Sequence, residues 1–247
     1  ISEAGELNIK LETDWKMEIE TVFQPPKSIY PISLLVSDKN LKQYHIAESE
    51  KAAHVTYFFN GGNDQAYPQE KDQIFKSPDV ESYDQQPEMS LPQVTENLVK
   101  VIGKGKFNLI VVNMANPDMV GHAGKFKAAQ KAIVVVDQHL DKLLQAASSA
   151  KYTTLVTADH GNIEQMVNPT TNKPDKEHTI NPVPFFWVDR YQSPSQKLDS
   201  EALWQEICQL NPSGVLADVS ATILNQLEVP IPEFIAGEEL SEALVKL

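Results

Sequence analysis

The sequence predicts an α/β fold in which a mostly parallel sheet carries helices on both of its faces. Short apolar runs such as residues 109–114 and 154–157 alternate with longer segments whose apolar residues recur at helical spacing. Strands that are apolar throughout are buried on both faces, which is typical of parallel sheets covered by helices. A chain of 247 residues can bury one large core of this kind.

The first elements follow a double proline at residues 25–26, which favours an extended connector. Residues 27–42 are expected to form a helix, with Pro31 tolerated in its first turn. Residues 54–59 are rich in aromatic and β-branched side chains and are expected to form a strand that a turn stops. The polar, proline-bearing stretch 63–92 is typical of a long functional loop.

The later elements have clearer patterns. Residues 124–149 form the most amphipathic segment, with apolar side chains every three to four positions. Asp218 is a good N-cap for the last helix. The predicted elements here are helices at 93–103, 124–149 and 218–227 and strands at 109–114, 154–157 and 183–188.

Composition narrows the possible partners. The net charge of −13 argues against nucleic acid and anionic membrane surfaces, and no apolar run is long enough to span a membrane. Arg190 is the only arginine, so we expect phosphate to be bound through metal ions or through cations that other protein supplies. Cys208 is the only cysteine, which excludes an internal disulfide and favours a reducing, cytoplasmic compartment.

Three polar motifs lie where predicted strands end. Asp118 and His122 follow the strand at 109–114, and the adjacent pair Asp159 and His160 follows the strand at 154–157. His178 precedes the last strand. Because ligands bind parallel sheets at the carboxyl ends of the strands, we expect these five side chains to converge there. Five nitrogen and oxygen ligands suit two ions such as manganese or zinc, and paired metals favour phosphoryl transfer.

Any one of these histidines taken alone is more often a surface or core residue, and the prediction depends on their joint placement. His54, in the predicted strand, is assigned to structure, and His139, on the long helix, to solvent. His45 is left unassigned. Ser77 and Ser90 lie beside prolines in turn contexts, so neither is expected to be a nucleophile.

At these motifs the sequence resembles the cofactor-independent phosphoglycerate mutases of the alkaline phosphatase superfamily, in the family's order over about residues 23–240. The matching stretches are AESEK at 47–51, HVTYFFNGG at 54–62, SYDQQPEMS at 82–90, NPDMVGH at 116–122, TADHGNIEQM at 157–166 and HTINPVP at 178–184.

The resemblance implies an alkaline phosphatase-like fold and a mutase that interconverts 3-phosphoglycerate and 2-phosphoglycerate, in glycolysis and gluconeogenesis, through a phosphoserine. It implies two divalent ions, with manganese expected. Asp118, His122 and His178 would hold one ion, and Asp159 with His160 would hold part of the other. Lys51 matches a lysine that approaches the phosphoryl group, and so would be both catalytic and substrate-binding.

The resemblance also divides the chain. Residues 1–22 are expected to be the tail of an inserted domain, 23–26 a hinge, and 27–247 an incomplete phosphatase-like domain. The family's nucleophilic serine and its substrate-clamping arginines match no segment here, and a family arginine is His45 in this chain. We therefore expect the chain alone to be inactive and to need the rest of its polypeptide. A monomer is favoured.

Two alternatives remain open from the sequence. Another phosphomutase or phosphatase of the same superfamily would use the same metal ligands, although the match at 82–90 and the pair Glu50 and Lys51 favour the phosphoglycerate mutase. A metal- or partner-binding domain without catalysis is the other alternative.

Overall fold

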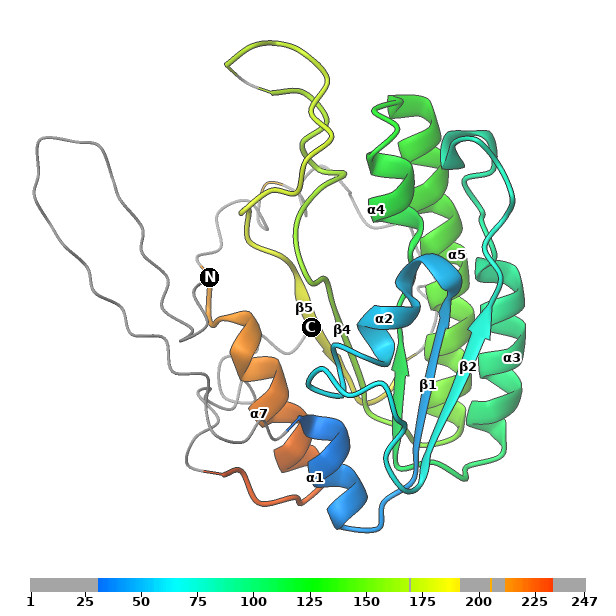
Figure 1. Ribbon diagram of the computed structural model, residues 1–247, viewed down its shortest axis with the longest axis vertical. Coiled ribbons are helices and arrows are strands. Elements are labelled where there is room, and N and C mark those ends of the chain that lie inside the picture. Colours follow the sequence, from blue (N-terminus) through cyan, green and yellow to red (C-terminus); the bar gives the residue numbers. More distant parts are fainter. Residues whose placement is uncertain (1–30, 169, 192–204, 206–211, 233–247) are drawn as a thin grey trace, which may run out of the picture.

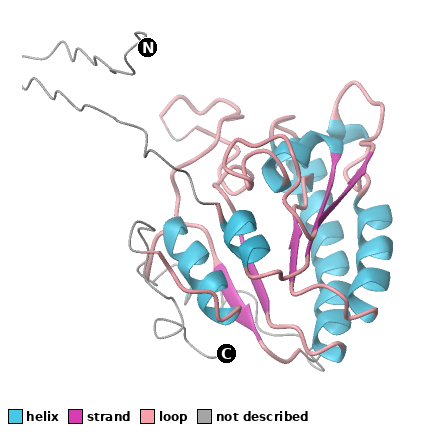
Figure 2. Ribbon diagram, turned by 60° about the horizontal axis from the view of Figure 1, so that its bottom comes forward, coloured by secondary structure: helices cyan, strands magenta, loops and turns pink. Residues whose placement is uncertain are grey.

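A computed structural model describes residues 31–168, 170–191, 205 and 212–232. Its centre is a sheet of three parallel strands, with helices packed on both faces (Figure 1). A second, two-stranded sheet lies beside it (Figure 2). The predicted α/β class with a parallel sheet and helices is therefore confirmed.

The three-stranded sheet has β1 (Gln43–Glu48) at its centre, between β2 (Glu70–Phe75) and β3 (Leu109–Val112). β1 runs parallel to both neighbours, and Ile46 lies opposite Val112. Every residue of β1 is buried. β1 thus sits inside the domain, whereas β2 forms an edge with partly exposed side chains.

One face of this sheet carries the main hydrophobic core. Tyr44 and Ile46 of β1 point into it and meet α3 (Leu91–Gly103) and α5 (Phe126–Ser149), which pack against each other. The buried helix residues of this core are Val94, Leu98, Ile102 and Leu143. α3 begins after Ser90 with Pro92 in its first turn, where the missing N–H of proline costs nothing.

Alternate residues of β1 point to the opposite face. Gln43 donates a hydrogen bond from Nε2 to the carbonyl of Ser33 at 2.7 Å, which ties β1 to α1 (Ile32–Asp38). α1 in turn contacts α7 (Leu216–Gln226), the last described helix. This two-sided burial explains why β1 is buried along its whole length.

The second sheet departs from the prediction. β4 (Thr154–Thr157) and β5 (Phe185–Val188) pair antiparallel, with Thr157 opposite Phe185. In the described residues this pair forms a sheet separate from β1, β2 and β3. The segments after β4 and before β5 therefore leave the pair at the same end.

Several sequence-predicted elements are corrected. The strand expected at 54–59 is wrong, because α2 (Ala52–Val55) and a series of turns occupy this region. The helix expected at 27–42 is described only from Ile32 and ends at Asp38. The aromatic run in the turns suggested a strand by composition, but local turn hydrogen bonds hold it instead.

Two elements were missed. β1 lies at 43–48, directly after the expected helix at 27–42, and β2 lies within the stretch 63–92 that was expected to be a loop. The sequence EKDQIF of β2 is polar because the strand is at an edge, where solvent reaches its side chains. Short 3-10 helices also appear at Ser49–Lys51 and Tyr83–Gln85.

The other predicted elements are placed to within a few residues. On α5, however, the first half turns Ala129 and Ala132 inward, while Phe126 and Ile133 are exposed. His139 on the same helix is half-buried instead of solvent-exposed, and burial lowers its pKa. In the described residues, no helix has the combination of length and apolar character that a membrane span requires.

The predicted tail at 1–22, the hinge at 23–26 and Cys208 lie outside the described residues. The proposed division of the chain into these parts therefore stays a prediction.

Candidate metal centre

The two parallel strands β1 and β3 bring distant residues to one end of the sheet. Ile46 and Val112 are partners, so the segments that follow them leave the sheet side by side. Lys51 ends the short 3-10 helix after β1, and Asp118 lies in the first turn of α4 (Asn116–Gly121) after β3. This topology explains why residues 67 positions apart in sequence can form a hydrogen bond.

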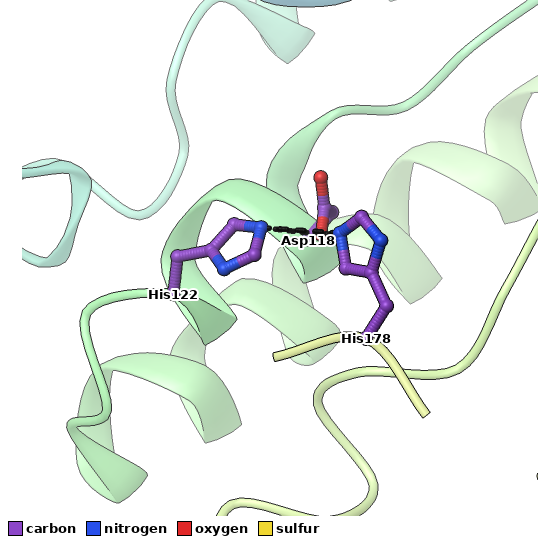
Figure 3. A group of neighbouring side chains, drawn as sticks. All are labelled: Asp118, His122 and His178. Atoms are coloured by element: carbon purple, nitrogen blue, oxygen red, sulfur yellow. Dashed lines mark hydrogen bonds and ion pairs between the residues drawn. The ribbon is translucent and has the colours of Figure 1, made fainter. Parts of the chain in front are cut away.

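The candidate metal centre consists of Asp118, His122 and His178. Figure 3 shows the two imidazole rings turned toward the carboxylate from opposite sides. Asp118 Oδ1 lies 3.0 Å from His122 Nε2 and 3.1 Å from His178 Nε2. The two Nε2 atoms are 3.2 Å apart. Because Asp118 and His122 are four residues apart at one helical turn, they share a face of the chain.

A hydrogen bond fixes which atom of His122 faces the centre. His122 Nδ1 lies 2.5 Å from the carbonyl oxygen of Lys176, so Nδ1 must carry the proton. In the neutral ring, Nε2 then presents a lone pair toward Asp118 Oδ1, which is also an acceptor. Acceptors that face one another at about 3 Å are brought together by a positive centre, either a proton on one of the rings or a bound metal ion. A carbonyl bond behind the ring is also the usual support of a metal-binding histidine.

Lys51 binds the other oxygen of the Asp118 carboxylate. Its Nζ lies 2.5 Å from Asp118 Oδ2, and the lysine side chain is almost fully buried. Burial alone would raise the pKa of Asp118, but the hydrogen bond and charge of Lys51, with nearby imidazoles, hold this pKa below its usual value. Asp118 therefore remains a carboxylate whose Oδ1 is directed at the two histidines.

His160 lies against the centre, whereas Asp159 does not join it. The rings of His160 and His178 stack with centroids 3.6 Å apart. Among the described residues, His160 Nε2 is buried without a hydrogen-bond partner, and Asp159 Oδ1 is 3.6 Å from it. Neither residue belongs to the group of three mutually close ligand atoms. The predicted set thus meets only in part, and the roles of all five residues stay predictions.

A clamp between two loops holds His160 beside His178. Gly161 and Thr179 form an isolated antiparallel bridge, with the Thr179 N–H 2.8 Å from the Gly161 carbonyl. Glu164 accepts a hydrogen bond from the Thr179 hydroxyl and, at 3.0 Å, one from the Asn181 side chain. A side chain at position 161 would collide with Thr179 and Glu164, so this close approach requires glycine.

From the sequence, His54 is expected to have only a structural role. Burial and the positive charge of Lys51 lower its pKa, and the charges of Asp159 and Asp118 oppose this effect. His54 therefore lies within electrostatic reach of the centre. His54 lies on α2, which begins directly after Lys51. The sequence would have indicated this proximity to Lys51 only if a helix had been predicted there.

The residues present fit a divalent metal ion. Two histidine nitrogens and one carboxylate oxygen, each 3.0–3.2 Å from the next, match the spacing of ligands around one ion of zinc or manganese type. His160, next to Gly161 of the clamp, adds a buried ring nitrogen that has no hydrogen-bond partner in the described part of the chain. Both features favour a cation-binding end of the domain.

Comparisons with known proteins agree with this fit. The metalloenzyme superfamily profile matches residues 2–231. A 2,3-bisphosphoglycerate-independent phosphoglycerate mutase of Thermomicrobium roseum is 43% identical over 218 residues, which cover 88% of this chain and 40% of that protein. The protein of the same name from Antithamnion is 40% identical and covers 93% of this chain and 42% of its own length.

A solved structure is similar as well. A crystal structure of Leishmania mexicana phosphoglycerate mutase at low cobalt concentration superposes with a TM-score of 0.70 at 29% identity, over 84% of this chain and 38% of that one. This chain thus spans about 40% of the length of the relatives that it matches. The chain belongs to the metalloenzyme superfamily and is homologous to part of the 2,3-bisphosphoglycerate-independent phosphoglycerate mutases.

Proposed function

We propose that this chain is the metal-holding part of a phosphoglycerate mutase that interconverts 3-phosphoglycerate and 2-phosphoglycerate through a phosphoserine at a two-metal site. The observation that carries the proposal is the meeting of Asp118, His122 and His178 at one end of the sheet. The identity of about 40% to mutases of that name supports the substrate.

In this proposal Asp118, His122 and His178 hold one divalent ion, and Asp159 with His160 contributes to a second. When bound, the two ions supply positive charge that stabilises the attacking and leaving oxygens of phosphoryl transfer. The expected ion is manganese, to which carboxylate and imidazole ligands are suited.

Lys51 has two functions in the proposal. Its ammonium orients Asp118 by holding Oδ2, which leaves Oδ1 for the metal. It also places a positive charge beside the carboxylate, where it can offset the negative charge of a phosphoryl group. Because Lys51 is almost fully buried, this charge is screened less by water than that of a surface lysine.

Metal binding tests the first part of the proposal. Calorimetric titration of the chain with Mn²⁺ should show binding that His178→Ala weakens by at least about tenfold. His139→Ala is the matched control, since this histidine lies on α5 away from the centre. If a correctly folded His178→Ala variant bound Mn²⁺ as tightly as the unaltered chain, the assigned ligand set would be wrong.

A chimera tests the reaction. The matching segment of the Thermomicrobium roseum mutase is replaced by this chain, and the product is assayed with 3-phosphoglycerate. We expect mutase turnover in the chimera, its loss in the chimera with Asp118→Asn, and none in this chain alone. A folded chimera that releases phosphate or acts only on a pentose phosphate would favour another enzyme of the superfamily. Turnover by the isolated chain would overturn the proposed need for an external serine.

A further inference from the structure

A second group of metal-ligand side chains lies between β1 and β2, which run side by side in Figure 1. It consists of His45, Glu70 and Asp72, whose ligand atoms all lie within 4.8 Å of one another. His45 Nδ1 is 3.4 Å from Glu70 Oε1 and 3.6 Å from Asp72 Oδ1. The side chains of His45 and Glu70 are fully buried, and that of Asp72 is 28% exposed.

The state of the imidazole follows from its neighbours. Gln43 Nε2 donates to the carbonyl of Ser33, so the other amide atom, Oε1, faces His45. His45 Nε2 lies 3.3 Å from this acceptor and must therefore carry the proton. When the ring is neutral, Nδ1 therefore directs a lone pair at two carboxylate oxygens. Nδ1 is buried and has no hydrogen-bond partner among the described residues.

The negative charge of this group is not balanced by a lysine or arginine of the described chain. Glu70 and Asp72 form ion pairs there only with His45. Lys71, between them on β2, points to the other face of the sheet, where its Nζ lies over the Tyr44 ring. Burying the Glu70 carboxylate beside the partly exposed carboxylate of Asp72 is costly without a cation, so a cation between them would stabilise the fold.

The distances fit a bound ion better than they fit hydrogen bonds. Donor–acceptor distances of 3.4 and 3.6 Å are long for N–H···O hydrogen bonds. Two ligand atoms at about 2.0–2.1 Å from a tetrahedral ion lie about 3.3 Å from each other. The hydrogen bond from His45 Nε2 to Gln43 is also the support that metal-binding histidines usually have.

The acid–base properties of the carboxylates agree. Burial works to raise the pKa of Glu70, but the neighbouring His45 and hydrogen bonds from Asn60 and the Tyr67 N–H hold it below its usual value. Burial and the charge of Glu70 raise the pKa of Asp72. Asp72 is the more exposed carboxylate of the group, and Glu70 is the deeper one.

We propose that His45, Glu70 and Asp72 form a structural zinc-type site that fastens the edge strand β2 to β1, with solvent completing the coordination beside Asp72. The site lies in the first half of the two strands, on the face that carries α1, and shares no residue with the candidate metal centre. It does not depend on the proposed mutase function.

The test uses zinc and the chain with His122→Ala and His178→Ala, which removes two ligands of the candidate metal centre. In this background we expect one equivalent of Zn²⁺ to bind and to raise the melting temperature. Adding Asp72→Asn should weaken zinc binding by at least tenfold. Asp64→Asn is the matched control, because this exposed carboxylate lies outside the group and should leave zinc binding unchanged.

His45→Arg provides a second, independent variant. Its guanidinium brings a permanent cation to the two carboxylates, so we expect a folded chain that no longer responds to zinc through this site. In the otherwise unaltered chain, Asp72→Asn and His45→Arg should each remove one equivalent of tightly bound zinc. If Asp72→Asn and His45→Arg, shown to be folded by circular dichroism, bind as much zinc as their parents, the proposal is wrong. A melting temperature that responds to pH but never to zinc would also overturn it.

Discussion

Lys51 Nζ and Asp118 Oδ2 form a buried ion pair between the segment after β1 and the first turn of α4. The two oxygens of the Asp118 carboxylate therefore have different partners. Oδ2 faces the lysine, while Oδ1 faces His122 and His178. The orientation of the candidate metal ligand Asp118 thus depends on a residue of the short 3-10 helix that follows β1. Substitutions can separate the effect of Lys51 on the orientation of Asp118 from the effect of its positive charge on the bound ion.

Lys51→Met should raise the affinity of the chain for Mn²⁺ by a few-fold to about tenfold. The substitution removes a positive charge that repels the ion across a partly screened distance. It should also raise the pKa of Asp118, whose lowering depends on Lys51. Calorimetric titration at pH 7 measures the affinity, and Lys127→Met, an exposed lysine on α5, is the control. Complete loss of Mn²⁺ binding would contradict this prediction and show that the orienting effect of Lys51 on Asp118 outweighs its repulsion of the ion.

Gly121→Ala should destabilise the chain by on the order of 1–3 kcal/mol and weaken Mn²⁺ binding. A methyl group at this position would overlap the side chain of Asn162, next to the clamp that holds His160. Gly103→Ala is the matched control, because a methyl group there meets nothing within 4 Å. Urea unfolding measures both variants.

The double variant Gly121→Ala with Asn162→Ala separates the collision from other effects. Removing the Asn162 side chain should restore most of the stability that Gly121→Ala loses. An equal loss in the single and double variants would show that the close approach to Asn162 is not the cause.

Glu164→Gln should lower the melting temperature at neutral pH, and this difference should shrink in acid. Burial tends to raise the pKa of Glu164, but hydrogen bonds from Thr179, Asn181 and the Asn162 N–H hold it below the ordinary 4.5. A lowered pKa means that the ionised carboxylate stabilises the fold above pH 4.5, and that this contribution is lost as the pH falls through the lowered value.

Thermal unfolding of Glu164→Gln and the unaltered chain from pH 7 to pH 3 measures this dependence. Glu81→Gln, an exposed carboxylate outside the clamp, is the control and should show no such change with pH. A difference between Glu164→Gln and the unaltered chain that stays constant over this range would contradict an ionic clamp.

Leu98→Ala should cost about 2–5 kcal/mol of unfolding free energy, because Leu98 is 2% exposed in the core between α3, α5 and β1. Gln93→Ala, an exposed residue of the same helix, should change stability by less than about 0.5 kcal/mol. Urea unfolding of both variants checks this. Similar losses in the two would mean that the packing of α3 on the sheet differs from the structure.

The sequence was most informative where periodicity was strong and uninterrupted. Residues 154–157 are a strand in both the prediction and the structure, and the long amphipathic helix begins two residues later than expected. β2 could not be predicted in the same way, because an edge strand exposes polar side chains and its sequence then resembles that of a loop. The aromatic run after α2 misled for the opposite reason, since its residues suit strands but lie in turns.

The candidate metal centre, too, could be predicted from the sequence only in part. The sequence alone determined the kinds of ligand, the likeness to a mutase family and the end of the strands at which the ligands follow. The family likeness also grouped Asp118, His122 and His178 around one ion. Only the tertiary structure decided that His160 stacks beside them without Asp159, and that His45 joins Glu70 and Asp72. The physical reason is that strand order and register set which distant residues become neighbours, and no local pattern of side chains encodes that pairing.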